Sequence, residues 1–133
     1  MACELCKAVE DKYRIFLEDE HSFAIIVREP QLRFHSMVLP KRHVEFLSEL
    51  TPKEAVSLNR MLEKASEKIE SAAGCSVTIM LNRNENKTQP HLHYHISPTG
   101  EGVRTLVSAL KKVPEYLYPP KEELTKMAEE LRR

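Results

Sequence analysis

QPHLHYHISP, residues 89–98, places a histidine at every second position of an otherwise apolar segment. Side chains alternate between the two faces of a β-strand, so His91, His93 and His95 are predicted to share one face and the residues between them the other. At about 3.3 Å per residue, neighbouring imidazoles stand roughly 6.6 Å apart, near enough to act on one bound group. The plainer interpretations are a solvated strand face or a purification tag, although a tag is not built with large apolar residues between its histidines.

The residues before this strand predict a hairpin and a long helix. Cys75–Leu81 is a second strand, and 82–89 is a polar connection between the two. Upstream, Thr51 and Glu54 form a capping box around Pro52 at the first helical position, and Gly74 ends the helix. Its apolar residues recur at spacings of three and four and predict one buried stripe; they are Ala55, Leu58, Leu62, Ala65, Ile69 and Ala72.

The remaining segments complete an α+β pattern. Residues 3–12 predict a short helix, three further strands are expected, and two helices follow the hairpin. The strands are Tyr13–Glu18, Ser22–Arg28 and Phe34–Leu39, and the helices are Val103–Lys112 and Lys121–Leu131. Because strands and helices do not alternate regularly, we expect an antiparallel sheet of about five strands, with the long helix and the C-terminal helices packed on it.

Composition narrows the class of protein. Twenty Lys plus Arg balance twenty Asp plus Glu, so no extended nucleic-acid surface is expected. No apolar run approaches the roughly 20 residues that span a bilayer, and the N-terminus lacks the apolar core of a secretory signal, so we expect no membrane association and a cytoplasmic protein. With three glycines there is no glycine-rich phosphate loop, and no organic cofactor is expected.

The histidine pattern resembles that of the histidine triad family, in which three histidines alternate with apolar residues. Residues 34–43, FHSMVLPKRH, are similar to the family's strand that runs from one histidine into Pro-Lys-x-His. The resemblance covers residues 3–98 as the core of a single domain, 1–133, with a C-terminal helical extension over 101–133. It implies a small α+β fold, a homodimer, and a nucleotide phosphate bound over the triad.

The resemblance also implies roles for individual residues. His93 would be the nucleophile that attacks the α-phosphorus of a nucleoside monophosphate conjugate, giving a phospho-histidine intermediate. His95 would donate to a phosphate oxygen, and His35 would orient the array. Thr88 would hydrogen-bond the leaving group and Asn82 would contact it or the phosphate, although ordinary turn chemistry also explains both residues.

The chain departs from the family's commonest form in two places. Its loop over 82–90 has no glycine, which leaves the preferred leaving group open. Val27 stands where many nucleotide-binding members place an acid on the ribose hydroxyls, and Glu29 is the nearest acid in sequence. Ribose recognition is therefore expected to be weak or changed.

Cys3 and Cys6 have the spacing with which one turn presents two thiolates to a tetrahedral ion. The family resemblance implies His43 and His91 as the other two ligands of a structural zinc site. The alternatives are a redox dithiol and two unremarkable cysteines.

Three functions follow from these patterns. The leading one is a hydrolase or transferase of nucleoside monophosphate conjugates. The second is a non-catalytic nucleotide-binding or protein-binding module. The third is a zinc hydrolase with His91, His93 and His95 as ligands, although three histidines along a strand converge poorly on one ion because the outer two lie about 13 Å apart.

Overall fold

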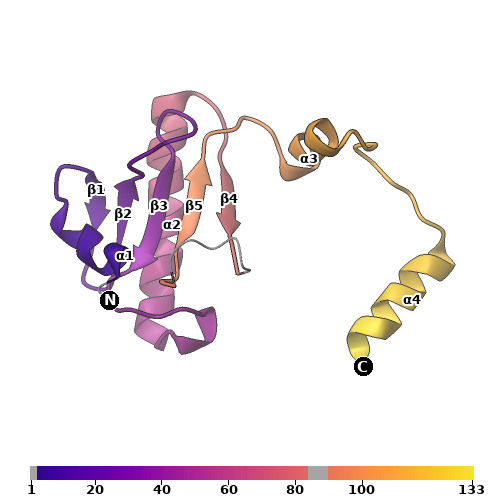
Figure 1. The fold of residues 1–133 in the computed structure, drawn as a ribbon, viewed down its shortest axis with the longest axis horizontal. Helices are drawn as coiled ribbons and strands as arrows, with labels where there is room; N and C mark the ends of the chain where they lie inside the picture. Colours follow the sequence, from indigo (N-terminus) through magenta and orange to yellow (C-terminus); the bar gives the residue numbers. More distant parts are fainter. Residues whose placement is uncertain (1–2, 84–89) are drawn as a thin grey trace. The chain divides into compact units, whose positions relative to one another are not determined.

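The computed structural model describes residues 3–83 and 90–133, in two compact units, Met1–Glu101 and Gly102–Arg133. The first unit contains one five-stranded sheet (Figure 1), in the order β1-β2-β3-β5-β4. Its strands are β1 (Ile15–Glu18), β2 (Ser22–Ile26), β3 (Ser36–Pro40), β4 (Thr78–Leu81) and β5 (Tyr94–Ser97). All neighbouring strands are antiparallel, which confirms the predicted fold class.

The long helix α2 (Pro52–Ala73) begins and ends where the sequence predicts. The Thr51 side chain accepts a hydrogen bond from the backbone N–H of Glu54, and the Glu54 carboxylate accepts one from the backbone N–H of Thr51. Gly74 takes a left-handed conformation at φ 74°, which only glycine adopts without steric cost.

The two faces of the sheet are covered by different helices. One face packs on α2 (Figure 1) and buries the larger hydrophobic core. That core contains Ala24, Val38, Val44, Leu58, Met61, Ala65, Ile69, Leu92 and Ile96. The other face buries a smaller core under α1 (Glu4–Lys7) and the 3-10 helix η1 (Ala8–Glu10). These two short helices replace the single helix predicted over 3–12.

A row of paired residues crosses the sheet on the α1 side. Ile25 pairs with Met37, Met37 with His95, and His95 with Met80. Directly opposed residues of antiparallel strands point to the same face, so His95 emerges on the face that α1 partly covers.

The prediction of a strand over His91–Ser97 is wrong at its start, because β5 begins at Tyr94. The backbone N–H of Leu92 bonds to the carbonyl of Val44, a residue beyond the end of β3, at 2.6 Å. The residues before Tyr94 therefore leave the ladder. The other four strands, β1 to β4, also differ from their predicted bounds, and Phe34 takes a positive φ of 72° just before His35.

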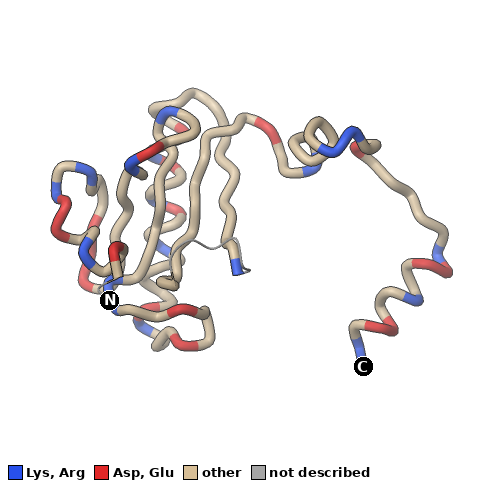
Figure 2. Tube along the Cα trace, viewed as in Figure 1, with Lys and Arg blue, Asp and Glu red and all other residues tan. Residues whose placement is uncertain are grey.

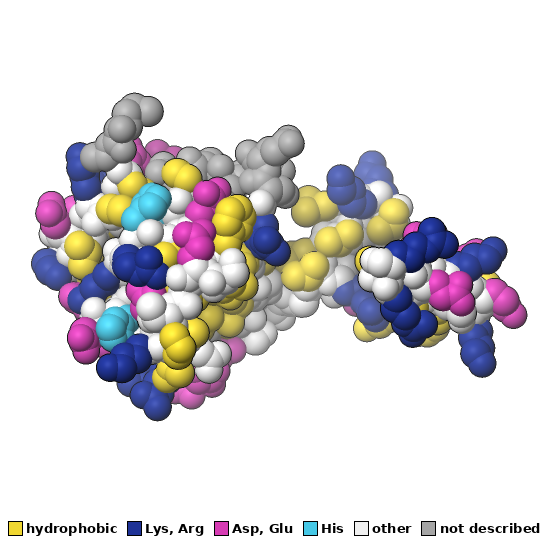
Figure 3. All heavy atoms as spheres, turned by 90° about the horizontal axis from the view of Figure 1, so that it is seen from below, with side chains coloured by type: hydrophobic (Ala, Val, Ile, Leu, Met, Phe, Trp, Pro, Cys, Tyr) yellow, Lys and Arg dark blue, Asp and Glu magenta, His cyan; other side chains and the backbone are white. Residues whose placement is uncertain are grey.

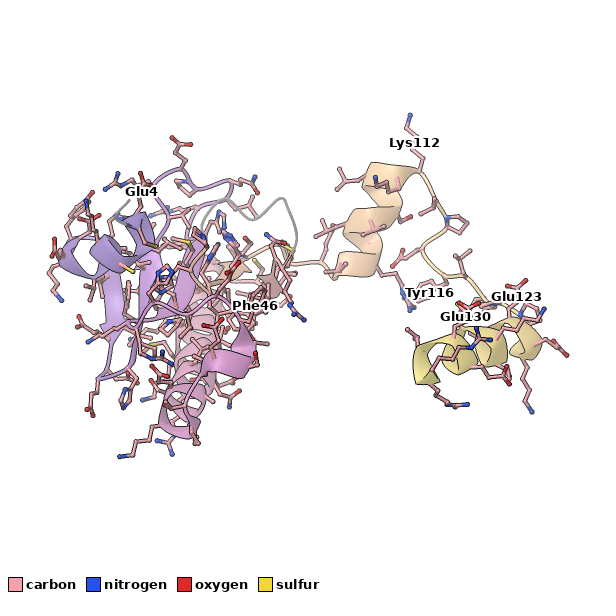
Figure 4. The ribbon with its side chains drawn as sticks, turned by 60° about the horizontal axis from the view of Figure 1, so that its bottom comes forward. Glu4, Phe46, Lys112, Tyr116, Glu123 and Glu130 are labelled. Atoms are coloured by element: carbon pink, nitrogen blue, oxygen red, sulfur yellow. The ribbon has the colours of Figure 1, made fainter. Side chains whose placement is uncertain are left out.

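The second unit contains α3 (Val103–Lys111) and α4 (Lys121–Arg132), each within one residue of its predicted bounds. Lys112, labelled in Figure 4, ends α3 in a left-handed conformation. Ser108 Oγ donates to the carbonyl of Val113 at 2.6 Å and secures the turn that follows. Across the described ranges, no helix is both long and apolar enough to cross a bilayer.

We predict that Arg42 contributes strongly to the stability of the folded protein. Its guanidinium donates two hydrogen bonds, at 2.9 and 2.8 Å, to Glu54, a carboxylate only 6% exposed. Arg42→Met should lower the free energy of unfolding at pH 7 by about 2–3 kcal/mol, because it leaves a buried charge without its cation. Lys41→Met, which breaks a surface ion pair with Glu18, should cost less than about 1 kcal/mol.

The pH dependence of unfolding checks the same pair. The hydrogen bonds from Arg42, and those from Thr51, lower the pKa of Glu54 to about 2. Because the folded-state pKa is depressed, this stabilisation is fully present above the unfolded pKa and is lost as the pH falls toward 2. Urea unfolding between pH 7 and 3 should show a smaller loss in Arg42→Met than in wild type; equal losses in the two proteins would contradict the assignment.

Candidate functional site

Four predicted metal ligands come together into what we call the thiol–histidine group: Cys3, Cys6, His43 and His91. Cys3 caps α1 and Cys6 lies within it, on the helix marked by Glu4 in Figure 4. His43 follows β3, and His91 precedes β5. Histidine side chains reach the surface on the face drawn in Figure 3, and His43 is the exposed histidine of this group.

The geometry of the thiol–histidine group fits a metal ion. The Cys6 Sγ atom lies 3.2 Å from His43 Nδ1 and 3.4 Å from His91 Nδ1, and Cys3 Sγ lies 3.7 Å from His91 Nδ1. All four ligand atoms lie within 4.8 Å of one another. Ligands of a tetrahedral zinc ion, at about 2.3 Å for sulfur and 2.0 Å for nitrogen, are separated by roughly 3.3–3.8 Å. The group can therefore hold a metal with little rearrangement.

Hydrogen bonding fixes the tautomer of His91. Its Nε2 atom lies 2.8 Å from the carbonyl oxygen of Pro40, which can only accept, so Nε2 carries the proton. The lone pair is then on Nδ1, the atom that faces the two sulfurs. A backbone carbonyl behind a ligating imidazole is the usual way in which proteins orient such a ligand.

Three of the other four histidines form what we call the histidine array: His35, His93 and His95. The ring centroids of His93 and His95 are 5.0 Å apart, and those of His35 and His95 are 5.1 Å apart. His35 precedes β3, His93 precedes β5, and His95 lies in β5. The array is therefore assembled by the pairing of β3 with β5.

A chain of hydrogen bonds sets the protons of the array. The backbone N–H of Gln31 donates to His35 Nδ1 at 3.3 Å, so His35 carries its proton on Nε2 and donates it to His95 Nδ1 at 3.0 Å. His95 is thereby left with its proton on Nε2. His93 Nδ1 lies 2.7 Å from the carbonyl oxygen of His91, so it donates, and the lone pair of His93 is on Nε2. A nucleophilic nitrogen and a hydrogen-bond donor thus belong to neighbouring rings.

Burial favours the neutral form of His35 and His95. Desolvation lowers the pKa of His35. Desolvation, reinforced by repulsion from His93 and His35, lowers the pKa of His95 to about 4. The tautomers of His35 and His95 described above require neutral rings, and these lowered pKa values favour neutral rings at pH 7.

The structure separates the three consecutive histidines that the zinc-hydrolase hypothesis would join. His91 turns to the sulfurs of Cys3 and Cys6, whereas His95 pairs with His35. Among the described residues, the group with metal-binding geometry contains only His91 of the three. The geometry thus separates one group that could hold a metal from the histidine array.

The two predicted substrate contacts stand apart from this geometry. Asn82 is exposed and directly follows β4, and among the described residues no hydrogen bond joins its side chain to the array. Thr88 lies outside the described residues. Their predicted roles remain predictions.

Analysis of the sequence did not identify several groups that shape the site. The carbonyls of Pro40 and His91 and the N–H of Gln31 set the tautomers, and backbone groups carry no side-chain signature. Pro40 could have been suspected, because it directly precedes the Lys-Arg-His segment that reaches the thiol–histidine group.

Comparison with known proteins places the array in a family context. The family model described as the HIT domain matches residues 8–102. The bis(5'-nucleosyl)-tetraphosphatase (asymmetrical) of Schizosaccharomyces pombe is 33% identical over 88 residues, 64% of this chain and 48% of the relative. The bis(5'-adenosyl)-triphosphatase of Dictyostelium discoideum is 33% identical over 87 residues, 63% of this chain and 58% of the relative. The chain thus spans about half of the length of these two enzymes.

A solved structure shows the same fold over nearly the whole length. A member of the HIT family from Bacillus subtilis matches with a TM-score of 0.74 at 23% identity, over 99% of this chain and 96% of that one.

Proposed function

Because this chain belongs to the HIT domain family, we propose that it is a nucleotide hydrolase or nucleotidyltransferase acting at the α-phosphate of nucleoside monophosphate conjugates. The observation that carries the proposal is the order of protons in the histidine array, in which His93 has its lone pair on Nε2 and the neighbouring His95 has a proton on Nε2. The two named relatives act on nucleoside polyphosphates, which supports a nucleotide substrate.

In the proposed reaction, His93 acts as the nucleophile. Its Nε2 lone pair forms a bond to the α-phosphorus, and the bond from phosphorus to the leaving group breaks with its electron pair, the leaving group taking up a proton from solvent. The intermediate carries the nucleotide on His93, and the carbonyl of His91 stabilises the charge at Nδ1. Water, or another acceptor, then attacks phosphorus, breaks the P–N bond and regenerates the imidazole.

His95 and His35 assist without bonding to phosphorus. The Nε2–H group of His95 would donate to a non-bridging phosphate oxygen as negative charge builds there. His35 holds His95 in the required tautomer, because it donates to Nδ1. Thr88 and Asn82 remain the proposed contacts to the leaving group.

The pH profile of turnover tests the neutral array. Since the pKa of His95 is lowered to about 4, the ring stays neutral until the solution is well below pH 6. We expect protonation of His95 to leave kcat/KM unchanged from pH 6 to 8 and to lower it below about pH 5. A titration of the His95 ring, followed by NMR, near the ordinary histidine pKa of about 6.5 would contradict its desolvation.

We further propose that the thiol–histidine group binds structural zinc. Two sulfurs and two imidazole nitrogens are the donor set that zinc takes in closed tetrahedral sites, and no position is left for substrate. The ion would fasten α1 to the segments before β5 and after β3. Thiolate ligands must remain reduced, so the proposed compartment is the cytoplasm.

The proposed assembly is a homodimer. β4 is an edge strand of the sheet, and two of its apolar side chains, Ile79 and Met80, are 44% and 43% exposed. Pairing of this edge with that of a second copy would cover both. Light scattering should give twice 15.4 kDa for wild type, and Met80→Lys should lower that mass; a monomeric wild type would contradict the proposal.

A turnover screen tests the activity. Nucleoside phosphoramidates, dinucleoside polyphosphates and nucleotide sugars share an α-phosphate and differ in leaving group, so the relative rates identify the preferred class. Protein that binds nucleoside monophosphates and turns over none of these substrates would support the non-catalytic binding module instead.

A further inference from the structure

A cavity of about 470 Å³ lies on the α1 side of the sheet. Leu5, Ala8 and Met37 supply apolar lining. Met37 is paired with His95 across β3 and β5, and neighbouring strands are about 4.8 Å apart. The cavity is therefore next to the histidine array, and a substrate with its phosphorus over His93 and His95 would extend its other end into it.

Asp11 is the carboxylate that is held in place in this cavity. Its Oδ2 atom accepts hydrogen bonds from Arg14 at 2.6 Å and from Arg28 at 3.2 Å. Those two bonds also lower the pKa of Asp11, so the group is ionised at pH 7. Both arginines use the same oxygen, and an ionised carboxylate accepts up to about four hydrogen bonds, so Oδ1 retains its capacity to accept from a ligand.

The support behind Asp11 is rigid. The Arg14 side chain is only 11% exposed, and its second nitrogen donates to the carbonyl of Ile26, at the end of β2, at 2.8 Å. A carboxylate fixed by a buried arginine that is itself tied to a strand is pre-organised for binding. Glu29, the acid closest to Val27 in sequence, is exposed and is not among the residues that line the cavity.

The charges of the cavity favour a neutral ligand that donates hydrogen bonds over an anion. Acidic and basic side chains are equally numerous in the lining, and Figure 2 shows both signs interspersed along the first unit. An anionic group would have to compete with Asp11 for Arg14 and Arg28. A donor group can bind to Oδ1 while both ion pairs stay intact.

Building on the proposed function, we propose that Asp11 is a specificity-determining residue whose Oδ1 atom accepts hydrogen bonds from the nucleoside end of the substrate. The donors are hydroxyl groups of the sugar or N–H groups of the base. Both the sugar and the base can present neighbouring hydrogen-bond donors to a carboxylate.

The test has two parts. The ligands are analogues that each lack one hydrogen-bond donor, and the protein variant replaces the accepting carboxylate of Asp11 with an amide that can donate. The ligands are phosphoramidates of adenosine, 2'-deoxyadenosine, purine riboside, guanosine and inosine. The proteins are wild type, Asp11→Asn and Glu10→Gln; Asp11→Asn keeps the shape but presents an N–H₂ group, and Glu10→Gln removes a charge from an exposed acid of the same cavity.

We expect at least one donor deletion to lower kcat/KM of wild type by about ten-fold or more, because a site built to bind a donor rejects the analogue that lacks it. A lower kcat/KM for 2'-deoxyadenosine than for adenosine would identify the sugar as the source of the donor. A lower value for purine riboside than for adenosine, or for inosine than for guanosine, would identify the base. Asp11→Asn should abolish that discrimination, whereas Glu10→Gln should retain it.

Two results would overturn the inference. One is a wild type whose kcat/KM is unchanged by every donor deletion, which requires no variant to fold. The other is a folded Asp11→Asn variant with undiminished discrimination. If wild type turns over none of these phosphoramidates, calorimetric binding of the corresponding nucleoside monophosphates decides the role of Asp11 separately; the proposed function itself fails only if dinucleoside polyphosphates and nucleotide sugars are not turned over either.

Discussion

His93→Ala is expected to lower kcat/KM by more than about 10³-fold, because removal of a covalent nucleophile leaves only binding and electrostatic assistance. His93 is 6% exposed and precedes β5, and the hydrophobic core beneath it is built from Leu92 and Ile96. The melting temperature should therefore change far less than the activity. Rates with a nucleoside phosphoramidate and thermal unfolding of the same preparation provide the measurement.

His21→Ala is the matched control. His21 lies in the turn between β1 and β2, so its loss should leave kcat/KM within about two-fold of wild type. His93→Asn keeps more of the side-chain volume and should be as inactive as the alanine variant. Retention of more than about a tenth of the wild-type rate by either His93 variant would exclude covalent catalysis by this residue.

Loss of the metal from the thiol–histidine group should be the largest single change in stability. A ligand that binds only the folded state at about 1,000 times its dissociation constant stabilises it by roughly 4 kcal/mol. The double variant Cys3→Ser with Cys6→Ser should lose about one equivalent of zinc per chain and a stability of this order. Metal analysis and unfolding with and without chelator measure both quantities.

The third cysteine supplies the control for this experiment. Cys75 lies in the connection between α2 and β4, where its thiol donates to the carbonyl of Pro98 at 3.4 Å. Cys75→Ser should retain the metal. The double cysteine variant should keep kcat/KM within about ten-fold of wild type, whereas a catalytic metal would make the loss more than about 10³-fold.

Much of the fold could be predicted because its signals are local. The capping box at Thr51, the left-handed Gly74 and the apolar residues between them define α2 without reference to any other segment. The predicted buried stripe is wrong at its two ends, because Ala55 and Ala72 are exposed. The grouping of Cys3 and Cys6 with His43 and His91 was also expected, but only from the family resemblance.

The start of β5 could not be predicted from alternation alone. Alternation continues through His91, Leu92 and His93, yet the backbone of Leu92 bonds to Val44 and leaves the sheet. The choice between these partners depends on where the segment after β3 lies in space. The side chains of His91 and His93 consequently serve different groups instead of one strand face.

The cavity residues illustrate a second limit. Asp11, Arg14 and Arg28 come from the end of η1, the segment before β1 and the segment after β2. In sequence each is one more charged residue in a chain with 20 bases and 20 acids. Asp11 and Arg14 are only three residues apart, but Arg28 reaches them only through the pairing of β1 with β2.

His91 connects the thiol–histidine group to the histidine array, since its ring faces the sulfurs while its carbonyl accepts a hydrogen bond from His93 Nδ1 at 2.7 Å. A short hydrogen bond to a carbonyl slows exchange of that proton with solvent and moves its NMR resonance downfield. Displacement of His91 when the metal leaves would shift the same resonance. A one-dimensional proton spectrum of unlabelled protein would then report metal content through a residue that does not bind the metal.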